Sequence, residues 1–119
     1  FGFNHPNPGV LEQGYGYEVW VTVPEGFPLP ENAAEKRFDG GLYAALTIRF
    51  PEFHRWGDLY RLVEASPRYV ANFSPLGDEV MQGGLEEHLN WVYSAAMGWP
   101  EDGIDGLLDL LLPIRKVEK

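Results

Sequence analysis

Residues 38–66, FDGGLYAALTIRFPEFHRWGDLYRLVEAS, change their hydrophobic period halfway along the segment. Over 42–50 apolar side chains alternate, which is typical of a β-strand, and the preceding glycine pair predicts a tight turn or bulge at its entry. From Phe53 to Val63 the apolar residues recur every three or four positions, between Pro51 and Pro67, which predicts an amphipathic helix of about four turns. A strand followed directly by a helix indicates a mixed fold.

Further strands are predicted on both sides of this pair. Alternation indicates strands at Tyr17–Val23, at 85–91 (LEEHLNW) and at 107–115 (LLDLLLPIR). Two other segments are interpreted as connections: FGFNHPNPG (1–9) as a loop, and VYSAAMGWPEDGIDG (92–106) as a short helical turn and loop. The order strand, strand, helix, strand, strand favours an α+β fold, with one helix packed on one face of an antiparallel sheet.

Each predicted strand has one aliphatic and one polar side. We expect the aliphatic side to form the helix-covered core, with Val19, Val21, Val23, the alternate residues from Leu42 to Phe50, Leu85, Leu89 and the alternate residues from Leu108 to Ile114. The other side would carry Glu18, Trp20, Thr22, Tyr43, Thr47, Glu86, His88, Asn90, Asp109 and Leu111. Carboxylates beside aromatic rings suit a concave site for an apolar cation. The alternative is a half-solvated sheet face with scattered aromatics. Glu87, on the aliphatic side, is expected near the sheet edge.

Composition restricts the classes of function. The 119 residues fit one domain, 1–119, and 18 acidic against 9 basic side chains give a net charge of −9, which disfavours direct nucleic-acid binding. The chain has no cysteine, and His5, His54 and His88 show no metal-ligand spacing, so no metal or other cofactor is predicted. With neither a membrane-length apolar run nor a signal peptide, a cytoplasmic location is expected. The first residue is not methionine, so we expect a longer protein.

Five segments in order resemble the GyrI-like small-molecule-binding domain, also called the AraC-type or BmrR-type effector-binding domain. They are VTVPEGFPLPEN (21–32), FDGGLYAAL (38–46), the helix with Trp56, LEEHLN (85–90) and LDLLLPI (108–114). The resemblance runs from about Tyr15 to Arg115 and implies two pseudo-symmetric βαββ modules whose sheet and helices enclose a ligand cleft. This chain would hold the last strand of the first module, Tyr17–Val23, and the whole second module. Glu18 and Asp109 would then be pseudo-symmetric partners.

The resemblance also implies roles for single residues. In the family, an aromatic or apolar residue, a glutamate, any residue and a tyrosine lie in sequence at the pocket bottom, where the acid meets cationic drugs. Leu85 to His88 occupy these places, so Glu86 is the matching acid and His88 replaces the usual tyrosine. A neutral His88 could hydrogen-bond a ligand, whereas a protonated one would repel a cation and pair with Glu86.

Aromatic residues complete the predicted ligand-binding set. Helical spacing favours Trp56 and Tyr60 as core residues, although the family places helix aromatics at the cleft. The face pattern adds Trp20, Tyr43 and Glu18 to Glu86 and His88.

The resemblance implies a ligand-sensing domain of a bacterial transcription regulator, with an upstream DNA-binding domain and a lipophilic or aromatic cation as ligand. Two alternatives stay open: a hydrolase of cyclopropane-bearing electrophilic toxins, in which Glu86 helps to activate water, and a stand-alone gyrase-inhibitor-like protein. Hydrolysis needs a base, a positioned water and a group that stabilises the leaving fragment, and the motif supplies Glu86 with His88 as a helper. Reversible binding without turnover is therefore predicted.

Overall fold

The computed structural model describes residues 1–4, 16–50, 52–73, 83–89 and 106–118. Within these ranges the elements are β1 (Gly2–Asn4), β2 (Tyr17–Val19), β3 (Tyr43–Arg49), a 3-10 turn η1 (Phe53–Arg55), α1 (Trp56–Glu64), β4 (Tyr69–Ala71), β5 (Leu85–His88) and β6 (Leu107–Lys116).

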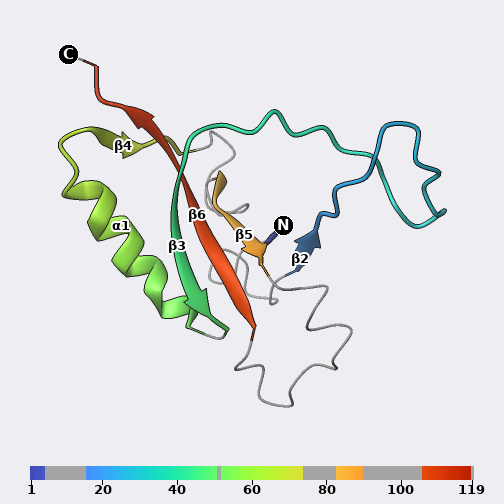
Figure 1. Cartoon of the computed structure of the whole chain (residues 1–119), viewed down its shortest axis with the longest axis horizontal. Coiled ribbons are helices and arrows are strands. Elements are labelled where there is room, and N and C mark those ends of the chain that lie inside the picture. Colours follow the sequence, from blue (N-terminus) through green and yellow to red (C-terminus); the bar gives the residue numbers. More distant parts are fainter. Residues whose placement is uncertain (5–15, 51, 74–82, 90–105, 119) are drawn as a thin grey trace.

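The described strands form one antiparallel sheet in the order β2-β1-β5-β6-β3, and β4 pairs with the far end of β6 (Figure 1). The ten-residue β6 lies between β5 and β3 and also pairs with β4, so it is the strand that joins these three parts of the sheet. One helix packed against an antiparallel sheet confirms the predicted α+β fold.

The hydrophobic period of β3 and β6 explains why they pair. Leu46 lies opposite Leu110 and Ile48 opposite Leu108, so the aliphatic residues of both strands occupy one face. A shift of one strand by one residue would move its aliphatic row to the other side of the sheet, away from the row of its partner, which is why this register is strongly specified.

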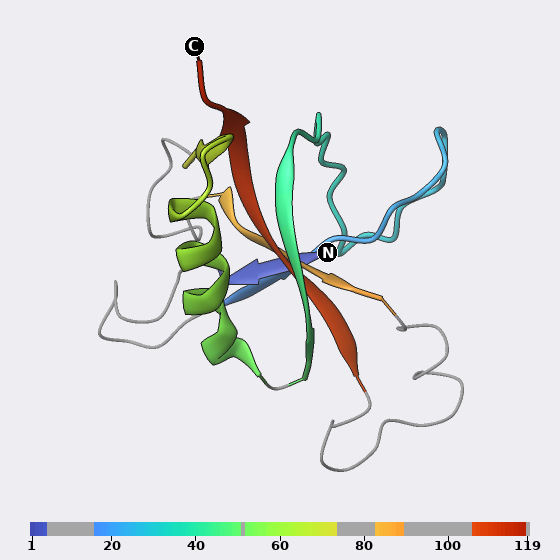
Figure 2. The ribbon, with the colours of Figure 1, turned by 60° about the vertical axis from the view of Figure 1, so that its left-hand side comes forward.

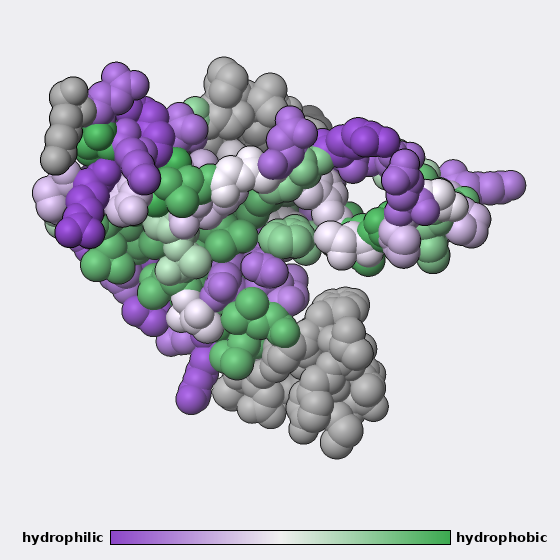
Figure 3. All heavy atoms as spheres, turned by 45° about the horizontal axis from the view of Figure 1, so that its top comes forward, coloured by the Kyte–Doolittle hydropathy of each residue, from purple (hydrophilic) through white to green (hydrophobic). Residues whose placement is uncertain are grey.

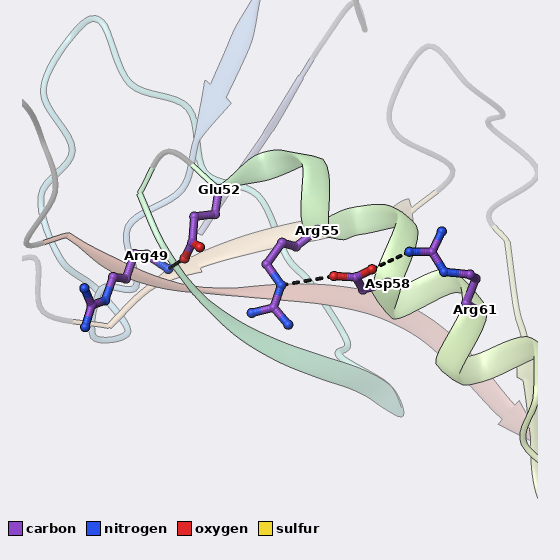
Figure 4. A network of polar contacts seen from close by, with 5 residues as sticks. All are labelled: Arg49, Glu52, Arg55, Asp58 and Arg61. Atoms are coloured by element: carbon purple, nitrogen blue, oxygen red, sulfur yellow. Dashed lines mark hydrogen bonds and ion pairs between the residues drawn. The ribbon is translucent and has the colours of Figure 1, made fainter.

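A short polar connection leads from β3 into the helix (Figure 4). The backbone N–H of Arg49 donates to Oε1 of Glu52 at 2.8 Å. In the first turn of α1 the Asp58 carboxylate accepts from Nε of Arg55 at 3.1 Å and pairs with Arg61, and these contacts lower the pKa of Asp58. An acidic residue at this end of a helix also complements the helix dipole.

The helix buries Leu59 and Val63 against β3, β4 and β6. The core cluster consists of Ile48, Leu59, Val63, Leu108, Leu110, Leu112 and Ile114, with Trp56, Tyr60 and Tyr69 among the partly buried residues packed on it. Figure 2 shows α1 on one side of the sheet. We call the sheet side that carries Leu108 and Leu110 the helix face, and the other side the opposite face.

The predicted strand at Tyr17–Val23 is too long. Strand β2 ends at Val19, and Val19, Val21 and Val23 are 68%, 78% and 46% exposed, so their assignment to the core is wrong. Leu42 and Leu89, 47% and 46% exposed, are also outside the core. Residues 21–42 are all exposed and project from the sheet on the side away from α1 (Figures 1 and 2). Alternation alone did not ensure a pairing partner for this segment.

Two described strands were not predicted. Residues 2–4 form β1 although the segment was interpreted as a loop, and Tyr69–Ala71 forms β4. Both are three-residue strands, too short to show a period. The rest of the predicted amino-terminal loop, at 5–9, and the predicted turn and loop at 92–105 lie outside the described residues.

Candidate functional site

Glu86 is a buried carboxylate in the middle of the sheet. It lies opposite Leu110 of β6 on one side and opposite Gly2 of β1 on the other, and the residue is 6% exposed. Side chains that are directly opposite in an antiparallel pair share a face. Glu86 therefore lies on the helix face with Leu110, and the prediction that it lies on the side away from the core is wrong.

The described partner of Glu86 comes from a strand that is distant in sequence. The Tyr17 hydroxyl donates to Oε2 of Glu86 at 3.3 Å, and Tyr17 itself is 41% exposed. Sequence reasoning did not select Tyr17, because it alternates with Val19 on the side of the strand that was assigned to the core.

Gly2 lets the Tyr17 side chain cross β1. A Cβ atom at Gly2 would lie 2.3 Å from the Tyr17 hydroxyl oxygen and 2.5 Å from two of its ring carbons. The ring of Tyr17 therefore occupies the space where a side chain at position 2 would stand. A glycine within a strand is a general sign of such a close approach, and it is the signal that could have identified this contact.

The electrostatics of the pair follow from burial. Loss of water raises the pKa of Glu86 to about 6, although the hydrogen bond from Tyr17 acts in the opposite direction. Burial, and then the neighbouring Glu86 carboxylate, raise the pKa of Tyr17 as well, so its hydroxyl stays protonated and remains a donor. Near neutral pH the site is thus a desolvated carboxylate with a neutral partner.

His88 lies on the same face as Glu86, two residues further along β5 and opposite Leu108. The side chain is half-buried, and burial lowers the pKa of His88. Of the two forms considered from the sequence, the neutral imidazole is therefore favoured at pH 7, and it adds no positive charge to the helix face.

Trp56 and Tyr60 also lie on this side of the sheet. Both project from α1, are half-buried and pack against the core cluster that contains Leu110, the cross-strand neighbour of Glu86. Their ring centroids are 6.3 Å apart, and Tyr60 stands 6.1 Å from Phe73. Helix aromatics and the buried acid thus share the helix face.

The remaining predicted site residues, Glu18, Trp20 and Tyr43, do not join Glu86. Glu18 lies opposite Phe3, and Phe3 is on the other face of β1 from its neighbour Gly2. Tyr43 lies opposite Pro113, on the other face of β6 from Leu112. Both therefore point to the opposite face, and Trp20 donates from Nε1 to Oε1 of Glu18 at 2.8 Å. The single polar face expected from alternation is in fact divided between the two sides of the sheet.

Glu87 also differs from its predicted place at the sheet edge. It pairs with Asp109, which pairs in turn with Thr47 of β3, so Glu87 lies within the sheet on the opposite face. The Thr47 hydroxyl donates to Oδ1 of Asp109 at 2.6 Å.

Among the described residues, no group of three or more histidine, cysteine, aspartate or glutamate side chains is placed to hold a metal ion. In the same part of the chain, no helix combines the length and apolar composition that crossing a membrane requires.

Comparison with known proteins identifies the family of this chain. The sequence model of the integron-associated effector binding proteins, Cass2, matches residues 1–114. No significant match was found among curated proteins or among solved structures. With nearly the whole chain matched, the protein belongs to the Cass2 family of integron-associated effector binding proteins, a GyrI-like effector-binding family.

Proposed function

We propose that this chain is a ligand-sensing domain that binds lipophilic or aromatic cations at Glu86. The observation that carries the proposal is a carboxylate only 6% exposed whose described partner is a neutral tyrosine hydroxyl. A buried carboxylate has lost hydration, and an incoming cation with diffuse charge restores part of this loss while covering apolar surface.

Two other described carboxylates are less suited to this role because each already holds a cation. Glu18 pairs with Lys36, and Asp58 lies between Arg55 and Arg61. Glu86 combines burial with a neutral partner, so a cationic ligand would meet an uncompensated negative charge there.

Aromatic side chains would provide the walls of the site. Tyr17, Trp56 and Tyr60 all belong to the helix face, and a cation–π contact contributes roughly 0.5–2 kcal/mol when it is shielded from water. Figure 3 shows apolar side chains gathered in the middle of the molecular surface, between hydrophilic ones on the left and the projecting segment on the right. An amphipathic cation matches a buried acid that shares its face of the sheet with aromatic side chains.

The biological setting belongs to the same proposal. Ligand binding would bias a DNA-binding domain elsewhere in a longer bacterial regulator, since the net charge of −9 argues against direct DNA contact by this segment. Expression of the chain together with its genomic upstream sequence, followed by operator binding with and without the cation, tests this part.

The binding site itself is tested by calorimetry with tetraphenylphosphonium, a lipophilic cation, and triphenylphosphine oxide, a neutral analogue. Glu86→Gln should weaken binding of the cation by roughly 5- to 150-fold, about 1–3 kcal/mol, and leave binding of the neutral compound nearly unchanged. Glu87→Gln is the matched control, because it removes the same charge from the next residue on the opposite face. Equal losses for both compounds, or equal effects of the two variants, would reject Glu86 as the cation site.

Hydrolysis is the second candidate function, favoured by one observation. A carboxyl group with a pKa of about 6 is suited to act as a general base near neutral pH, and His88 lies on the same face. The Tyr17 hydroxyl stays protonated and is already hydrogen-bonded to Glu86. Hydrolysis also needs a positioned water and a group that stabilises the leaving fragment, so binding without turnover is the preferred proposal.

A further inference from the structure

Four aromatic rings form a row on the opposite face, and we call them the aromatic row: Phe3, Trp20, Phe38 and Tyr43. Phe3 meets Trp20 edge to face with 5.1 Å between centroids, Trp20 stands 5.4 Å from Phe38, and Phe38 stands 6.4 Å from Tyr43. Phe3 and Tyr43 belong to strands β1 and β3, whereas Phe38 belongs to the projecting segment 21–42. The row therefore connects this segment to the sheet.

An ammonium group already occupies this surface. Nζ of Lys36 lies 5.9 Å from the centroid of the Trp20 ring and pairs with the Glu18 carboxylate. Glu18 is held in place by the indole N–H of Trp20, which donates to the same oxygen at 2.8 Å. A cation over an aromatic face with a carboxylate beside it is the arrangement that recognises alkylammonium ions.

The ion pair between Lys36 and Glu18 is weak enough for another cation to replace the lysine. Its side chain is 53% exposed, that of Glu18 is 21% exposed, and ion pairs near the surface contribute little net stability. The lysine is also tethered to a segment in which residues 21–42 are all exposed, so little other burial keeps it in place. By contrast the backbone of Trp20 is anchored to β1, because its N–H donates to the Phe1 carbonyl at 2.8 Å, and its ring packs edge to face on Phe3.

We propose that Glu18, Trp20 and Phe38 form a second cation site, separate from Glu86, for a small quaternary ammonium ion, and that Lys36 is its internal occupant. The quaternary ion displaces Lys36, because its weaker hydration makes it the better partner for an aromatic face, while Glu18 keeps a positive neighbour throughout. Displacement also releases Lys36 from the sheet, so binding changes the attachment of the segment 21–42.

The probe is tetramethylammonium chloride, titrated against sodium chloride at equal ionic strength, and the readout is the NMR signal of the Trp20 indole N–H. Trp20→Phe identifies this signal among those of the four tryptophans. Lys36→Met should bind the probe about fivefold more tightly, because an exposed ion pair is worth up to about 1 kcal/mol. Glu18→Gln should bind it at least tenfold more weakly.

Two controls separate this site from the rest of the molecule. Lys116→Met removes an exposed lysine at the end of β6 and should change the affinity for tetramethylammonium by less than about twofold. Glu86→Gln should also change this affinity by less than about twofold. Unchanged amide spectra show that each variant is folded. The proposal is overturned if Lys36→Met binds no more tightly than Lys116→Met, if Glu18→Gln leaves affinity unchanged, or if Glu86→Gln abolishes the signal change.

Discussion

Replacing Glu86 by glutamine should stabilise the protein at neutral pH. The pKa of Glu86 is about 6 in the folded chain, against 4.5 for an unperturbed glutamate, so the folded state disfavours the charged form by about 1.5 pKa units. At 1.36 kcal/mol per unit this amounts to about 2 kcal/mol above pH 7. Glutamine keeps an oxygen that can accept the Tyr17 hydrogen bond and carries no charge, so the variant avoids this cost.

The sign of the pH dependence follows from the raised pKa. A carboxyl group that binds its proton more tightly when folded stabilises the native state fully below pH 4.5, and this contribution is lost as pH rises through 6. The stability difference between Glu86→Gln and the wild type should therefore be about 2 kcal/mol larger at pH 7.5 than at pH 4. Urea unfolding of both proteins at these two pH values measures this change, because the other titrating groups are common to both.

Glu87→Gln serves as the control, since it removes one carboxylate from the same strand on the opposite face. A stability difference for Glu86→Gln that is independent of pH, or one that shrinks as pH rises, would refute the argument that burial penalises this charge. A saturating lipophilic cation should bring the wild type closer to the variant at pH 7.5, because it stabilises the charged form.

Further predictions concern the same site and the core. Affinity for tetraphenylphosphonium should fall about tenfold for each pH unit well below 6, as Glu86 takes up a proton; titration calorimetry from pH 4.5 to 8 checks this. Tyr17→Phe removes a hydrogen bond that lowers the pKa of Glu86, so the midpoint of that profile should move upward, and Gly2→Ala should act alike by displacing the Tyr17 ring. Leu110→Ala, at a fully buried position, should cost about 2–5 kcal/mol in denaturant unfolding, against about 0.5 or less for Val21→Ala. Incubation with a cyclopropane-bearing electrophile should give no water adduct by mass spectrometry; an adduct lost in Glu86→Gln would favour the hydrolase.

The sequence alone was sufficient to predict the elements that are long enough to show a hydrophobic period. Strand β3, the helix and strand β6 each contain enough apolar positions to distinguish a period of two from one of 3.6, so their type and approximate ends were predicted. The order of these elements then led to the α+β fold, and the family motif picked out Glu86. These features depend on residues close together in the chain.

The tertiary structure decided which residues meet. Alternation within β5 separates Glu86 and His88 from Leu85, but it cannot say which set faces the helix, because both sides of a short strand can be buried. The register with β6 places Leu85 opposite Leu111 and Glu86 opposite Leu110, and so reverses the predicted faces. The same pairing separates Glu86 from Glu18, and only the pairing of β1 with both β2 and β5 brings Tyr17 across Gly2 to the carboxylate. Backbone hydrogen bonds between distant segments fix these neighbours, and the alternation of side chains within one strand does not specify them.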